Sequence, residues 1–170
     1  MNILRKLEIR PELKTISWLN PIHFLSLGFG SGLAPIAPGT FGTIAAIPVY
    51  LAMQLLPPSF YISLTLIFMF AGFWFCGYTA KALNTHDHPA IVWDEVVGLL
   101  ITLSIFPFSW ITLLLGFLLF RLFDIIKPWP ISWLDKHVHG GVGIMLDDVL
   151  AGLMAWGCLW LISSYLVPLS

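Results

Sequence analysis

The chain has 170 residues, of which 58% are hydrophobic and only 10% are charged, and its formal net charge at pH 7 is −1. This composition excludes an ordinary soluble domain and gives no basic surface for nucleic acid, and it indicates an integral membrane protein. Basic and acidic residues nearly balance, so we expect their placement along the chain to matter more than their sum.

The first 20 residues mix basic and acidic side chains without a long apolar core, which is not the pattern of a cleaved signal peptide. We interpret residues 1–20 as a cytoplasmic N-terminal segment. Residues 21–170 contain no polar linker long enough to separate two halves. We therefore expect this part to form a single membrane domain.

Five apolar segments follow one another along the chain and predict an all-α, polytopic bundle of about five transmembrane helices. Lengths of about 16 to 24 residues correspond to ~24 to 36 Å of helix, close to the thickness of a bilayer core. A shorter stretch, residues 21–33, runs into a turn rich in glycine and proline, and we expect an interfacial or re-entrant half-helix there. The predicted spans are residues 41–56, 60–80, 91–106, 110–126 and 144–167.

The charged residues between these segments all fall on one side of the membrane if the N-terminus is cytoplasmic. Lysines and arginines precede the first span, follow the second, and lie between the fourth and fifth. The opposite connections, residues 57–58 and 107–109, carry no charge. The chemistry of the protein is therefore expected at the cytoplasmic face.

A glycine-rich stretch, GFGSGLAPIAPGT at residues 28–40, precedes the first predicted span. Glycines such as Gly39 let backbone amides approach an anion, and the hydroxyls of Ser31 and Thr40 can donate to a phosphate near a helix start. The spacing is not that of a P-loop, so a tight turn before a membrane helix is the alternative interpretation.

Carboxylates gather at the cytoplasmic ends of three predicted spans, where they are expensive beside lipid and indicate function. Basic residues accompany them at the end of the fourth span, three residues apart along one helix face. Two structural alternatives stay open: the first acids stabilise a helix dipole, or the acid and arginine on the fourth span neutralise each other. The residues are Asp94 and Glu95, then Arg121, Asp124 and Lys127, then Asp147 and Asp148.

Oxygen ligands from three helices favour a hard cation such as Mg²⁺, since the two cysteines lie inside apolar runs. With Arg121, Lys127 and the glycine-rich stretch to bind an anion, the chemistry indicated is phosphoryl transfer to water. An ion or metabolite transporter that uses the acidic helix ends is the alternative from another class.

Four motifs, in this order and spacing, resemble the bacterial phosphatidylglycerophosphatase A family from about Asn20 to the end: GFGSGLAPIAPGTFGT, HDHPAIVWDEVVG, FRLFDIIKPWPI and HGGVGIMLDDVLAG. The resemblance implies a Mg²⁺-dependent phosphatase domain in the bacterial inner membrane. Such an enzyme hydrolyses phosphatidylglycerophosphate to phosphatidylglycerol and phosphate, with its active site facing the cytoplasm.

The resemblance also implies roles for particular residues, and it leaves the oligomeric state open. Asp87 falls within the same motifs. The implied catalytic and metal-binding residues are Asp94, Glu95, Asp124, Asp147 and Asp148, and the implied substrate-binding residues are Ser31, Gly39, Thr40, Arg121 and Lys127.

Overall fold

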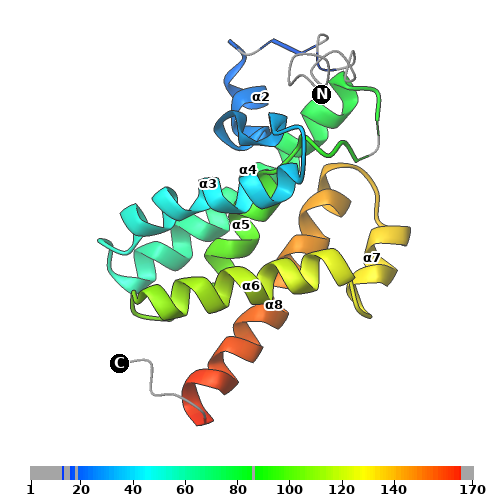
Figure 1. Ribbon diagram of the computed structural model, residues 1–170. Helices are drawn as coiled ribbons and strands as arrows, with labels where there is room; N and C mark the ends of the chain where they lie inside the picture. Colours follow the sequence, from blue (N-terminus) through cyan, green and yellow to red (C-terminus); the bar gives the residue numbers. More distant parts are fainter. Residues whose placement is uncertain (1–12, 14–15, 18, 86, 166–170) are drawn as a thin grey trace.

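The computed structural model describes residues 13, 16–17, 19–85 and 87–165 (Figure 1). Most of the predicted N-terminal segment 1–20 and the end of the last predicted span lie outside them. Every regular element in the described residues is helical, which confirms the all-α class. The elements are α2 Pro21–Ser26, η2 Gly28–Leu33, α3 Pro38–Met53, α4 Pro58–Ala82, α5 Trp93–Thr102, α6 Trp110–Ile126, α7 Ile131–His137 and α8 Gly140–Tyr165.

Two of the described helices are long and apolar enough to cross a membrane, α4 and the stretch Gly140–Ser164 of α8. Helix α3 is apolar but shorter, at 16 residues, and α6 has 17. The span expected at residues 91–106 is helical only over the 10 residues of α5. Of the five expected spans, two therefore correspond to described helices that are long enough to cross a membrane.

Helix α5 forms the centre of the bundle. Eight of its 10 residues are buried, and it packs against α3, α4, α6 and α8. Large apolar side chains are exposed on the surrounding helices instead, among them Phe70 and Trp74 on α4 and Leu118 on α6. A bilayer would cover such a surface. Protein therefore surrounds α5 on these sides, and its length is not set by contact with lipid.

A close crossing of α5 and α8 sets the spacing of the acidic side chains. A methyl group on Gly152 would lie 2.6 Å from the Gly98 carbonyl oxygen. The Thr102 hydroxyl donates to that carbonyl at 2.9 Å and lies 3.3 Å from the Gly152 carbonyl oxygen. Asp94 and Asp148 each stand four residues before one of these glycines, so the crossing brings both carboxylates toward one point.

We expect Gly152→Ala to lower the free energy of unfolding by about 1–3 kcal/mol, because the added methyl overpacks this crossing. Gly157 in the same helix is the matched control, since an added methyl there meets nothing within 4 Å. Gly157→Ala should be neutral or slightly stabilising, as alanine is the better helix former. Thermal unfolding in detergent measures both, and equal melting temperatures would contradict the close crossing.

The N-terminal half-helix forms as α2 followed by η2. Buried hydrogen bonds tie α2 to α4: His23 Nδ1 lies 3.0 Å from Thr79 Oγ1, which donates to Ser26 Oγ at 2.8 Å. The chain then turns through positive φ at Phe29 and Gly30. This arrangement delivers the chain to the start of α3, beside the acidic helix ends.

Candidate functional site

A polar pocket of about 310 Å³ lies at the end of the bundle where α3, α5 and α8 begin and α6 ends. Four helices and the segment before α5 contribute to it, so residues far apart in sequence meet there. Its lining comprises Ala37, Pro38, Gly39, Asp87, Pro89, Ile91, Asp94, Glu95, Arg121, Asp124, Ile125, Lys127, Asp147 and Asp148. All five predicted carboxylates and both predicted cationic residues are thus brought together.

Three of these carboxylates form a tight group. Asp94, Glu95 and Asp148 each offer one oxygen, and these oxygens lie within 4.8 Å of one another. Asp94 is 9% exposed and Asp148 3%. Asp94 Oδ1, Glu95 Oε2 and Asp148 Oδ2 are buried and have no hydrogen-bond partner.

A cation fits this group on chemical grounds. Buried carboxylate oxygens without partners are costly, and three like charges so close together repel one another. A divalent cation would relieve both penalties. The donors are all carboxylate oxygens, which suits a hard cation.

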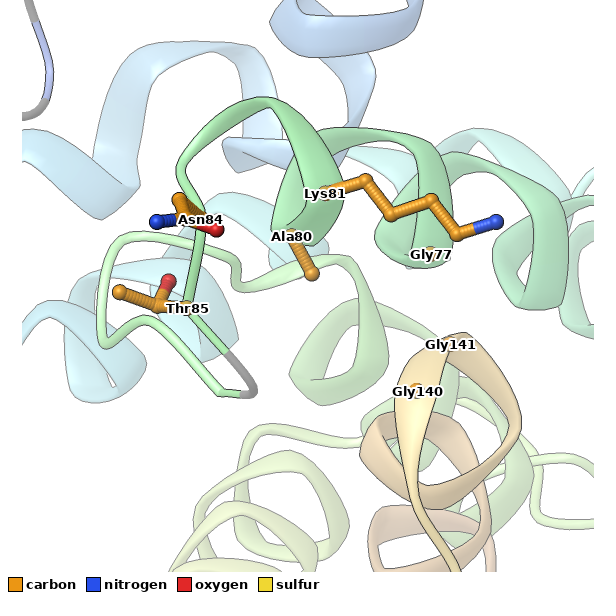
Figure 2. Close-up of a pocket in the computed structure, with 7 residues that line it drawn as sticks. All are labelled: Gly77, Ala80, Lys81, Asn84, Thr85, Gly140 and Gly141. Carbon is orange, nitrogen blue, oxygen red and sulfur yellow. The ribbon is translucent and has the colours of Figure 1, made fainter.

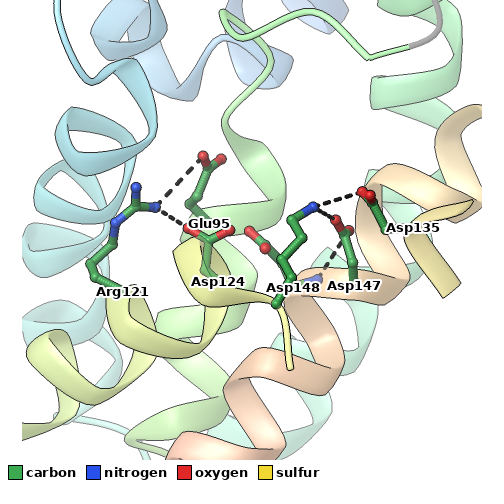
Figure 3. A network of polar contacts seen from close by, with 7 residues as sticks. Glu95, Arg121, Asp124, Asp135, Asp147 and Asp148 are labelled. Atoms are coloured by element: carbon green, nitrogen blue, oxygen red, sulfur yellow. Dashed lines mark hydrogen bonds and ion pairs between the residues drawn. The ribbon is translucent and has the colours of Figure 1, made fainter. Parts of the chain in front are cut away.

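Arg121 and the start of α3 lie beside this group (Figure 3). Arg121 Nη1 donates to Asp124 Oδ2 and lies 3.9 Å from Glu95 Oε1. Arg121 and Asp124 therefore form the ion pair that the alternative interpretation expected. Both residues also line the pocket, so the ion pair does not separate them from the site.

Gly39 allows the first turn of α3 to come this close. A methyl group on Gly39 would overlap Glu95 Oε1 and would lie 3.1 Å from Arg121 Nη1. The first amides of a helix have no partner within the helix, and the positive end of its dipole favours anions. A guanidinium and a helix N-terminus therefore flank one side of the acidic group, which is an arrangement suited to phosphate.

Lys127 ends α6 in a left-handed conformation, with φ of 45°. Its ammonium donates to Asp135 Oδ1 at 2.8 Å and also to Asp147 Oδ2. Figure 3 labels these two carboxylates. Burial alone would lower the pKa of Lys127, but the two carboxylates outweigh it and raise that pKa above its ordinary value. The lysine stays protonated and offsets the charge of Asp147, so any contact with substrate must compete with this pairing.

Of the three residues predicted for phosphate binding in the glycine-rich stretch, only Gly39 lines the pocket. Ser31 Oγ instead donates to the Gly28 carbonyl oxygen at 2.7 Å within η2. Side chains at Gly28 and Gly32 would collide with the segment 90–92. The part of the stretch around η2 is therefore a tightly packed turn, as in the alternative interpretation. Thr40 is not in the pocket lining but directly follows Gly39, which is.

A second cavity, of about 400 Å³, lies between the end of α4 and the start of α8 (Figure 2). Lys81 is the charged residue in its lining, and none of the predicted site residues belongs to it. The helices approach closely here: a methyl on Gly141 would lie 2.5 Å from the Gly77 amide nitrogen. Gly141 thus serves helix packing, whereas Gly140 has a positive φ of 74° and an added methyl there would meet nothing within 4 Å.

Sequence reasoning missed two features that support the polar pocket from outside its lining: one carboxylate and one glycine crossing. Asp135 holds the Lys127 ammonium, and its only sequence signal was its place in a charged loop after Pro130. Gly98 and Gly152 bring α5 and α8 together, and an isolated glycine within an apolar run was their signal.

Comparison with known proteins identifies the family. A family model described as Phosphatidylglycerophosphatase A matches residues 24–163. The chain belongs to the phosphatidylglycerophosphatase A family. This confirms the resemblance carried by the four motifs.

Curated members of the phosphatidylglycerophosphatase A family match most of the chain. The Escherichia coli strain K12 protein of that name is 47% identical over 147 residues, which cover 86% of this chain and 86% of the relative. The Haemophilus influenzae protein of the same name is 46% identical over 145 residues, covering 84% of this chain and 89% of the relative. No solved structure was found to match.

Proposed function

We propose that this protein is a lipid phosphatase that hydrolyses phosphatidylglycerophosphate to phosphatidylglycerol and inorganic phosphate. The observation that carries the proposal is the pocket in which Asp94, Glu95 and Asp148 converge beside Arg121 and the first turn of α3. Phosphoryl transfer needs groups that bind the phosphate oxygens and a site that activates water. Membership of the family and the names of the two relatives described above support the choice of substrate.

The residues of the pocket divide between two tasks in this proposal. Arg121 and the amides at the start of α3 bind and orient the terminal phosphate, since a guanidinium presents planar donors to its oxygens. Glu95 and Asp124 position that guanidinium from the other side. In the net reaction, a water oxygen becomes bonded to phosphorus, the bond from phosphorus to the glycerol oxygen breaks, and a proton passes to that glycerol oxygen.

Asp94, Glu95 and Asp148 would hold Mg²⁺. When bound, this ion polarises phosphoryl oxygens and lowers the pKa of a water molecule. Asp124 and Asp147 line the same pocket but are paired with Arg121 and Lys127. We assign Asp124 and Asp147 to the catalytic centre because they contact its two cationic side chains.

We also propose that residues 21–170 form one domain with five membrane crossings, α3, α4, α5, α6 and α8, in the bacterial inner membrane. Residues 1–20 and the polar pocket would face the cytoplasm. Lysines at the end of α4, at the end of α6 and in α7 support this orientation, because they lie toward the end of the bundle that holds the pocket.

The transporter alternative has little support. A path across the membrane should place charged side chains through the bilayer depth. Every described aspartate and glutamate instead lines the polar pocket or, for Asp135, the neighbouring cavity of about 230 Å³ that shares Asp87 and Asp147 with it. The family match adds nothing in favour of transport.

Metal removal tests the proposed function. Purified protein in detergent should release phosphate from phosphatidylglycerophosphate with Mg²⁺, lose this activity by more than about 100-fold in EDTA, and regain it when Mg²⁺ is restored. Undiminished turnover in EDTA would exclude the metal. Failure to hydrolyse this lipid with either Mg²⁺ or Mn²⁺ would exclude the activity itself.

A further inference from the structure

An apolar groove of about 420 Å³ lies between α3 and α6. Trp110 is 71% exposed and Leu114 59%, whereas Leu113 at the floor is 5% exposed. The groove therefore opens outward from the bundle and has an apolar floor. Its walls are Ile44 and Ile47 of α3 with Trp110, Leu113, Leu114 and Phe117 of α6.

The groove and the polar pocket are built on the same two helices. On α6, Leu114, Phe117, Arg121 and Ile125 recur every three or four residues and so follow one helix face. The first two line the groove and the last two line the pocket. Ile125 is 69% exposed, so this edge of the pocket is open toward the outside of the bundle.

Helix α3 repeats this pattern from the other side. Gly39 in its first turn lines the pocket, whereas Ile44 and Ile47 line the groove. Thr40, Ile44 and Ile47 share one helix face, being four and then three residues apart. The apolar groove and the polar pocket thus follow one another along the same two helices, α3 and α6.

We propose that the α3–α6 groove binds an acyl chain of the lipid substrate while the phosphorylated headgroup occupies the polar pocket. This inference rests on the proposed function, since it places the hydrocarbon part of the same molecule. All six wall residues are apolar, as an acyl chain requires. The substrate would enter sideways from the bilayer, between the start of α3 and the end of α6.

The dimensions of the groove favour an acyl chain over a partner helix. From Arg121, the α6 wall reaches Phe117 after ~6 Å and Trp110 after ~17 Å of helix rise. One leaflet supplies about half of the ~30 Å hydrocarbon core. Leu114 and Phe117 therefore lie ~11 and ~6 Å of helix rise from Arg121, within one leaflet of the headgroup site. The groove volume of about 420 Å³ is that of a pocket for one small ligand, and is narrow for a helix about 10 Å across.

Filling the groove provides the test. Leu114→Trp should raise KM for dioleoyl phosphatidylglycerophosphate about 10-fold or more, because each displaced methylene is worth about fourfold in an equilibrium constant. For the dihexanoyl form, kcat/KM should change by less than about twofold, since its chains are too short to fill the groove. Leu66→Trp on α4 is the matched control, because Leu66 is 46% exposed and outside the groove.

The outcomes separate this inference from the proposed function. An unchanged KM of Leu114→Trp for the dioleoyl lipid, or an equal fall in kcat/KM on both lipids, would overturn the groove assignment. In either case, hydrolysis by the wild type would leave the proposed function intact. Hydrolysis of neither lipid by the wild type would overturn the function and the inference together.

Photolabelling gives a second measurement that does not depend on the folding of Leu114→Trp. Wild-type protein would be irradiated with phosphatidylglycerophosphate that carries a diazirine in one acyl chain. We expect label on peptides 44–47 and 110–117, with competition by unlabelled lipid. Label spread over α4 and α8 without enrichment in these peptides would contradict the proposal.

Discussion

Asp148→Asn is expected to lower kcat on phosphatidylglycerophosphate by more than about 100-fold, since loss of even an outer partner of a metal ligand costs about 10- to 100-fold. Asparagine keeps the shape of the side chain but removes one negative charge from the group with Asp94 and Glu95. Cation affinity should fall with it, and a titration with Mn²⁺ followed by electron paramagnetic resonance measures that affinity directly.

The melting temperature of the metal-free protein distinguishes a metal-binding role of Asp148 from a structural role. Its Oδ2 atom is buried without a hydrogen-bond partner, among like charges. Removing its charge relieves repulsion, so without metal the Asp148→Asn variant should unfold at the same temperature as the wild type or higher. A lower melting temperature would indicate a structural carboxylate.

Asp135→Asn is the matched control for the loss of a carboxylate. The Asp135 side chain is 42% exposed and outside the polar pocket, and it contacts the Lys127 ammonium. Exposed ion pairs contribute little, so we expect turnover to fall by less than about fivefold. Near-normal turnover in Asp148→Asn, or an equal loss in both variants, would contradict a special role for the three clustered carboxylates.

Arg121→Gln is expected to lower kcat/KM by about 10²- to 10³-fold, the usual loss when one group that stabilises transition-state charge is removed. Arg121→Lys should restore only part of the activity, because an ammonium cannot contact Glu95, Asp124 and a phosphate with the same planar set of donors. Steady-state phosphate release measures both variants.

Mn²⁺ binding distinguishes a phosphate ligand from a group that only neutralises acids. Removing Arg121 makes its surroundings more negative, so Mn²⁺ should bind at least as tightly in Arg121→Gln as in the wild type. If the variant loses Mn²⁺ binding, or if Arg121→Gln with Asp124→Asn regains turnover, the arginine serves Asp124 rather than the substrate.

The sequence predicted the helical class because apolar runs of membrane length leave few other structures. It could not show that α5 stops at Thr102. Hydropathy does not distinguish a segment covered by lipid from one covered by protein, and α5 is apolar because four other helices surround it. The lengths of α4 and α8, which carry exposed apolar side chains, were anticipated more closely.

The meeting of the acidic helix ends was also predictable, because carboxylates at the ends of apolar segments have few reasons to be there. Their pairing was not predictable. Which acid faces Arg121 and which faces Lys127 depends on the rotation of α6 and on where α7 turns back toward α8. The position of Ser31 outside the pocket lining was not predictable for the same reason, since the packing of η2 against segment 90–92 is a long-range contact.

The central claim is that Asp94, Glu95 and Asp148 hold one divalent cation beside Arg121 and the start of α3. Crystals grown with Mn²⁺ and measured for anomalous scattering test it most directly. We predict an anomalous peak in contact with carboxylate oxygens from all three residues. A peak bound elsewhere in the chain, with these three carboxylates turned away from one another, would contradict the account.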